Sequence, residues 1–79
     1  MRFLKTIVTP SLVQTKQMGR GFVAAVYRFD NDYGEELYQF KLFESHGKYG
    51  YELVEQGFAP NVKTAEKKAQ MVFDDIMSG

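Results

Sequence analysis

The clearest pattern in the chain is a helical one near its C-terminal end. From Asn61 to Met77, apolar residues recur three and four positions apart, and at about 100° per residue they fall on one narrow stripe. The stripe consists of Val62, Ala65, Ala69, Val72 and Ile76, with Phe73 at its edge. Asn61 follows Pro60 and is a good N-cap, with Thr64 as the other candidate. The segment therefore predicts one amphipathic helix.

The residues before the helix follow strand-like patterns. Residues 22–29 are apolar on both faces, which is typical of a central strand, and residues 37–44 and 49–56 predict two further strands. Residues 2–9 also predict a strand. Residues 10–18 fit either a short helix or a strand, and we favour the strand. Turn residues separate these segments, at Gly19-Arg20-Gly21, at Asp30-Asn31-Asp32-Tyr33-Gly34 and at Ser45-His46-Gly47-Lys48.

Closing the hairpins tightly gives an expected register. In the second hairpin it places Leu42 opposite Tyr51 and Lys41 opposite Glu52. In the first hairpin it places Val23 opposite Leu42. The face expected under the helix then holds Val23, Ala25, Tyr27, Tyr38, Phe40, Leu42, Tyr49, Tyr51 and Leu53. The face expected to stay uncovered holds Phe22, Ala24, Val26, Arg28, Leu37, Gln39, Lys41, Phe43, Glu52 and Val54.

Length and composition favour one small folded domain. The chain has 79 residues, 44% of them hydrophobic and 15% aromatic, so residues 1–79 are expected to form one domain with a small core. The predicted fold class is α+β: an antiparallel meander of three to four strands with one C-terminal helix packed on one face. No signal peptide or membrane span is read from the sequence, so a cytoplasmic protein is expected.

The sequence contains no recognisable catalytic constellation. It has no cysteine, and its one histidine, His46, lies in a predicted turn without a second histidine, which is typical of a solvated side chain. The acidic stretch from Asp30 to Glu36 lacks the ligand spacing of a calcium loop. We therefore expect no enzyme activity, no cofactor and no metal site.

Charge and the uncovered face point to a binding protein. Residues 1–29 hold five basic and no acidic side chains, whereas residues 30–60 hold two basic and seven acidic ones. Such asymmetry favours a charged partner or self-association. The predicted function is a protein-binding module, acting through the outer sheet face or a sheet edge, as a homodimer or on another protein. The expected protein-binding residues are Phe22, Val26, Arg28, Leu37, Lys41, Phe43 and Val54. In size and class the chain resembles many phage-encoded inhibitors of host defence systems.

Nucleic-acid binding is the alternative function. The start of the predicted helix resembles the last helix of double-stranded-RNA-binding domains, which opens with lysines and continues with alanines, although Val62 and Glu66 stand where that family carries lysine. Three strands followed by a helix also resemble the arm-site-binding domain of phage integrases, and neither resemblance assigns a site residue. The candidate nucleic-acid-binding residues are Arg20, Arg28, Lys63, Lys67 and Lys68.

Overall fold

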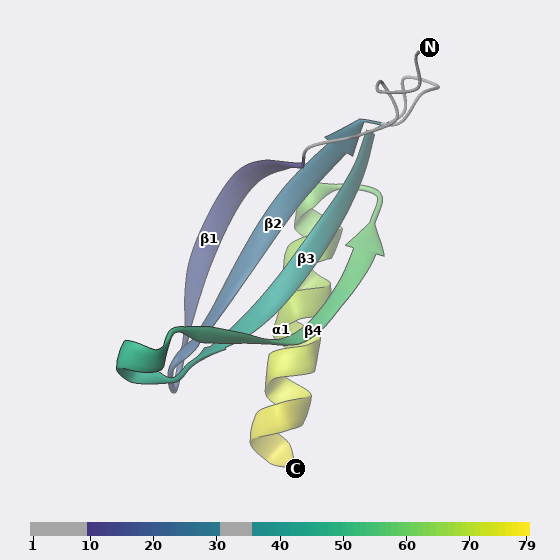
Figure 1. The fold of residues 1–79 in the computed structure, drawn as a ribbon. Coiled ribbons are helices and arrows are strands. Elements are labelled where there is room, and N and C mark those ends of the chain that lie inside the picture. The colour runs from purple at the N-terminus through teal and green to yellow at the C-terminus, as the bar shows by residue number, and fades with distance from the viewer. Residues whose placement is uncertain (1–9, 31–35) are drawn as a thin grey trace.

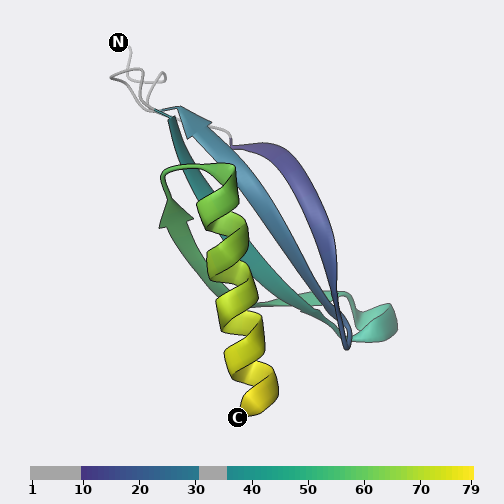
Figure 2. The same ribbon diagram turned by 180° about the vertical axis from the view of Figure 1, so that it is seen from behind.

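The chain forms a four-stranded sheet with one helix lying across it. The computed structural model describes residues 10–30 and 36–79. The elements are β1 (Ser11–Gly19), β2 (Phe22–Asp30), β3 (Glu36–Ser45), the short 3-10 helix η2 (Gly47–Tyr49), β4 (Tyr51–Ala59) and α1 (Val62–Ser78). The strands are antiparallel in the order β1-β2-β3-β4. Figure 1 views the sheet from the side away from α1, and Figure 2 shows α1 in front of it.

This architecture confirms the predicted α+β class, with its meander of strands and C-terminal helix. Residues 10–18, which fitted two structures, form most of β1, so the preferred strand is correct. The Gly19-Arg20-Gly21 turn is also confirmed, and all three residues have positive φ, which explains its two glycines. The strand expected at residues 2–9 lies outside the described residues, as does most of the turn after Asp30.

Helix α1 follows the sequence prediction closely. Asn61 is the N-cap, and its Oδ1 accepts a hydrogen bond of 2.8 Å from the backbone N–H of Thr64. Ala65, Ala69 and Phe73 are buried, and Val62, Val72 and Ile76 pack against the same core. The first turn carries no acidic residue and the last turn no basic one. Burial of the apolar stripe, rather than charge at the helix ends, therefore holds α1 in place.

The core lies between α1 and the facing side of the sheet. The aromatic rings of Phe22 and Phe73 meet edge to face, with centroids 5.5 Å apart. Leu42 is completely buried beside them. Helix α1 packs on β2, β3 and β4, and a hydrogen bond from the Gln14 amide to the Glu66 carboxylate joins it to β1. The buried cluster is made up of Phe22, Ala24, Val26, Phe40, Leu42, Ala59, Ala65, Ala69 and Phe73.

The register expected from tight hairpins is wrong at both connections. Between β2 and β3 it is off by one residue, so Val23 pairs with Phe43, and Leu42 pairs with Ala24. Between β3 and β4 the shift is larger, because η2 occupies the connection where a tight turn was expected. Lys41 therefore pairs with Gln56 rather than Glu52. A shift of one residue exchanges the two faces of a strand, so the expected faces of β2 are inverted.

Extra residues in β1 and β4 also change the faces. The pairing of β1 with β2 shifts between Leu12 and Gln14, which makes Val13 an extra residue and keeps Leu12 on the side away from α1. The pairing of β3 with β4 shifts between Leu42 and Phe43, where Val54 is the extra residue. Strand β4 bends sharply along its course in Figure 1. Such bulges are a known source of strand bending.

Removing an aromatic ring from the core should cost much of the stability of this small domain. Phe40 is 3% exposed and Phe73 is 9% exposed, so Phe40→Ala or Phe73→Ala should lower the free energy of unfolding by about 3–5 kcal/mol. Chemical denaturation followed by circular dichroism measures this. The matched control is Tyr49→Ala, because Tyr49 is 83% exposed and its loss should change stability by no more than about 0.5 kcal/mol. Equal stabilities for the core and control variants would contradict this account of the core.

Close packing of Phe40 on the backbone of β4 gives a second test. A Cβ atom added at Gly57 would lie 2.8 Å from Cε1 of Phe40, so Gly57→Ala should destabilise the fold by about 1–3 kcal/mol. Leucine lacks that ring atom, so the same substitution in a Phe40→Leu background should cost less. A double-mutant cycle measures this coupling, and strict additivity would show that the contact does not limit residue 57.

Candidate functional site

The side of the sheet away from α1 is not covered by any part of the chain that the structure describes. We call it the open face. By strand register, β1 and β2 contribute Leu12, Thr15, Gln17, Val23, Ala25, Tyr27 and Phe29 to it. Strands β3 and β4 contribute Leu37, Gln39, Lys41, Phe43, Tyr51, Leu53, Gln56 and Phe58. Several are large apolar residues with a third or more of their surface exposed: Leu12, Leu37, Tyr51, Leu53 and Phe58.

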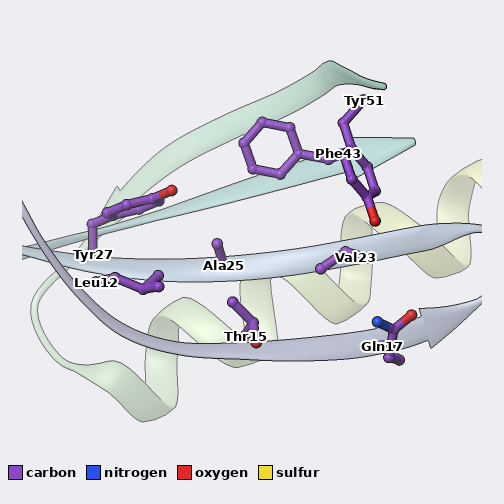
Figure 3. Close-up of a pocket in the computed structure, with 8 residues that line it drawn as sticks. All are labelled: Leu12, Thr15, Gln17, Val23, Ala25, Tyr27, Phe43 and Tyr51. Carbon is purple, nitrogen blue, oxygen red and sulfur yellow. The ribbon is translucent and has the colours of Figure 1, made fainter. Parts of the chain in front are cut away.

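A hollow of about 300 Å³ opens on this face. Figure 3 shows how side-chain size creates it: the short side chains of Ala25 and Thr15 lie in the middle, Tyr27 stands at one end, and Phe43 and Tyr51 stand together at the other. Leu12, Val23 and Gln17 complete the lining. Ala25 is only 3% exposed although no helix among the described residues covers it, because the larger side chains around it shield it. The hollow is therefore an apolar depression with aromatic ends.

The rest of the open face is also held by side-chain contacts. Phe29 and Phe58 form an edge-to-face aromatic pair with centroids 6.1 Å apart. Between this pair and the hollow, the Lys41 Nζ lies 5.2 Å from the centre of the Tyr27 ring, in cation–π geometry. Lys41 is the one acidic or basic residue on the part of the open face that the structure describes. An apolar surface with one cation is suited to binding, and it lacks paired groups for acid–base chemistry.

Only some of the sequence-predicted protein-binding residues lie on this face. Leu37, Lys41 and Phe43 do. Phe22 is 5% exposed and Val26 2% exposed, both in the core under α1, so placing them on the outer surface was wrong. The correction follows from the one-residue difference in register between β2 and β3. Two others lie elsewhere: Arg28 pairs with Tyr38 on the α1 side of the sheet, and Val54 is the extra residue of β4.

Sequence reasoning assigned several lining residues to the buried face. Val23, Ala25, Tyr27 and Tyr51 were expected under the helix, and the structure places them on the open face. Strand β2 is apolar at both alternating sets of positions, so its pattern could not orient it. In β3 the apolar set of Tyr38, Phe40 and Leu42 alternates with polar residues, and the prediction for this strand is correct. The glycine at position 50 was the sequence signal for a longer connection before Tyr51. The structure gives Gly50 a φ of +95°, a conformation that favours glycine.

The candidate nucleic-acid residues are spread over the molecule. Arg20 lies in the β1–β2 turn, and Arg28 lies near the other end of β2, roughly 26 Å away along an extended strand. Lys63 and Lys67 are exposed on α1, and the Lys68 Nζ donates a hydrogen bond of 2.8 Å to the backbone oxygen of Phe58. Nucleic-acid binding therefore stays a prediction for which these positions supply no added support.

In the described ranges, 10–30 and 36–79, no helix is long and apolar enough to cross a membrane.

The comparisons with known proteins add no family. Protein-family models, curated proteins and solved structures were all compared with the chain, and none of them matches it.

Proposed function

We propose that this protein is a small non-enzymatic binding module that associates with a second copy of itself through the open face of its sheet. One observation carries the proposal. The open face combines the hollow between Tyr27 and Tyr51 with exposed Leu53 and Phe58 beside it. Contiguous apolar surface of this kind marks interaction sites in folded proteins. Aromatic residues at its centre are typical of the residues that dominate interface energies.

The open face is large enough for a specific contact. Its strands are nine or ten residues long, so the four-stranded face measures about 30 Å by about 17 Å. Stacking two such faces would bury on the order of 1,000 Å² in total, which reaches the lower limit for a specific interface. The expected affinity is accordingly modest, and dissociation on dilution is expected.

Two-fold symmetry makes the face complementary to itself. When two sheets stack face to face about an axis parallel to their strands, β1 of each copy lies over β4 of the other. Leu53 and Phe58 project from β4, whereas most of the hollow lies on β1 and β2. Each copy therefore supplies projecting side chains to the hollowed half of its partner. Both halves of the contact are made twice, as a closed dimer requires.

The proposal predicts a concentration-dependent dimer that one exposed substitution breaks. Tyr51 is 64% exposed, so Tyr51→Lys should fold normally while placing a charge at the centre of the contact. Its dimer dissociation constant should rise by about tenfold or more, as for an interface hot spot. Sedimentation velocity over a range of concentrations measures this, with thermal unfolding as the check on folding.

The matched control is Tyr49→Lys. Tyr49 is 83% exposed and belongs to η2, outside the lining of the hollow, so this variant should dimerise like the parent. Leu12→Lys, at the opposite wall of the hollow, gives an independent second variant that should behave as Tyr51→Lys does. A parent that stays monomeric at every concentration, or a folded Tyr51→Lys variant with unchanged affinity, would rule out the proposed dimer.

A further inference from the structure

Three side chains of the types that bind metal ions cluster at the connection between β3 and β4, away from the open face. It contains Glu44, His46 and Glu52, and one potential ligand atom from each lies within 4.8 Å of the other two. The His46 Nε2 and a carboxylate oxygen of Glu52 are 2.8 Å apart. Glu44 pairs directly with Glu52 across the two strands. The cluster is therefore built by strand register and by one loop residue.

The two carboxylates are an unfavourable pair without a cation. Like charges directly opposite each other on neighbouring strands destabilise a sheet. His46 contacts Glu52, but no hydrogen bond or ion pair joins the half-buried Glu44 side chain to another described residue. Lys48, the basic residue of the same loop, places its Nζ 5.5 Å from the centre of the Tyr49 ring rather than against the carboxylates. A bound cation would remove this repulsion.

The loop holds His46 in place by backbone hydrogen bonds. The His46 N–H donates to the Gly50 oxygen at 2.7 Å, and the His46 oxygen accepts from the Tyr49 N–H at 3.2 Å. Gly47 and Gly50 have positive φ, which allows this compact path. The Gly47 N–H also donates to the Ser45 Oγ at 3.2 Å. The imidazole thus projects from a fixed backbone toward the two glutamates, and little of the loop needs ordering when a ligand binds.

We infer that Glu44, His46 and Glu52 form a binding site for a divalent transition-metal ion, with Zn²⁺ as the best fit. One imidazole and two carboxylates are ligands that Zn²⁺ accepts, whereas Ca²⁺ and Mg²⁺ prefer oxygen ligands alone. Around a tetrahedral Zn²⁺ the ligand atoms stand about 3.3 Å apart. In the structure the three ligand atoms lie within 4.8 Å of one another, and the exposed side chains of His46 and Glu52 are the ones that would adjust around the ion. Three protein ligands leave a fourth position for water or for a donor from a partner.

Isothermal titration of the protein with Zn²⁺ tests this site. The parent should bind one ion per chain, and excess Zn²⁺ should raise its melting temperature because the ion binds the folded state. Each of Glu44→Gln, His46→Gln and Glu52→Gln should weaken binding by about tenfold or more, since even the loss of a supporting residue behind a metal ligand has effects of that order. In these variants the Zn²⁺-dependent rise in melting temperature should shrink accordingly.

Glu55→Gln is the control, because it removes the same charge from the same strand at an exposed position outside the cluster. Its Zn²⁺ affinity should stay within about twofold of the parent's. Circular dichroism without metal confirms that each variant is folded. Absence of saturable Zn²⁺ binding by the parent would overturn the inference. So would equal affinities in Glu55→Gln and in folded variants of the three ligands, because binding would then lie elsewhere on the chain.

Discussion

The packing of α1 on one side of the sheet is the contact on which the rest of the structure depends. Ala65 and Ala69 bring the helix backbone close to the sheet, and Phe73 reaches across to Phe22. One helix has one apolar stripe, so it covers one face of a four-stranded sheet. Strands β2 and β3 nevertheless carry apolar residues on both faces. The second apolar face is therefore a direct consequence of the architecture, and it is the surface on which we propose binding.

The apolar side chains of the open face differ widely in how exposed they are. Ala25 lies almost fully buried at the centre of the open face, while Leu12 and Tyr51 around it remain more than half exposed. A small residue surrounded by large ones produces a hollow, and a hollow offers more contact area to an inserted side chain than a flat face does. The Lys41 ammonium group lies over the Tyr27 ring. This contact stabilises the positive charge on the open face without an acidic side chain beside it. These features favour insertion of a partner's apolar side chains over contact with plain solvent.

The sequence pattern predicted α1 and the strands β2, β3 and β4, but it could not predict how they face one another. Helix α1 has one apolar stripe, and in the middle of β3 the apolar residues Tyr38, Phe40 and Leu42 alternate with polar Gln39 and Lys41, so the predicted inner faces of both were correct. Strand β2 runs Phe22-Val23-Ala24-Ala25-Val26-Tyr27 without a polar position, so its orientation depended on the length of the following turn. The expected register between β2 and β3 was off by one residue. Val23 and Ala25 were therefore assigned to the buried face in place of Phe22 and Val26. Register is set by backbone geometry at the connections, and composition says little about it.

The β3–β4 connection decides which side chains of β4 lie on each face of the sheet. A tight hairpin would have placed Glu52 opposite Lys41, a favourable pair on a solvated sheet. The backbone path through Gly47 and Gly50 instead places Glu52 opposite Glu44. Tyr51, one residue earlier, then points to the open face, because neighbouring residues on a strand project to opposite sides. The proposed dimer contact and the proposed metal site thus share β4 but lie on opposite faces of it, so a substitution in one should leave the other unchanged. Both proposals depend on the loop path through Gly47 and Gly50, which have positive φ.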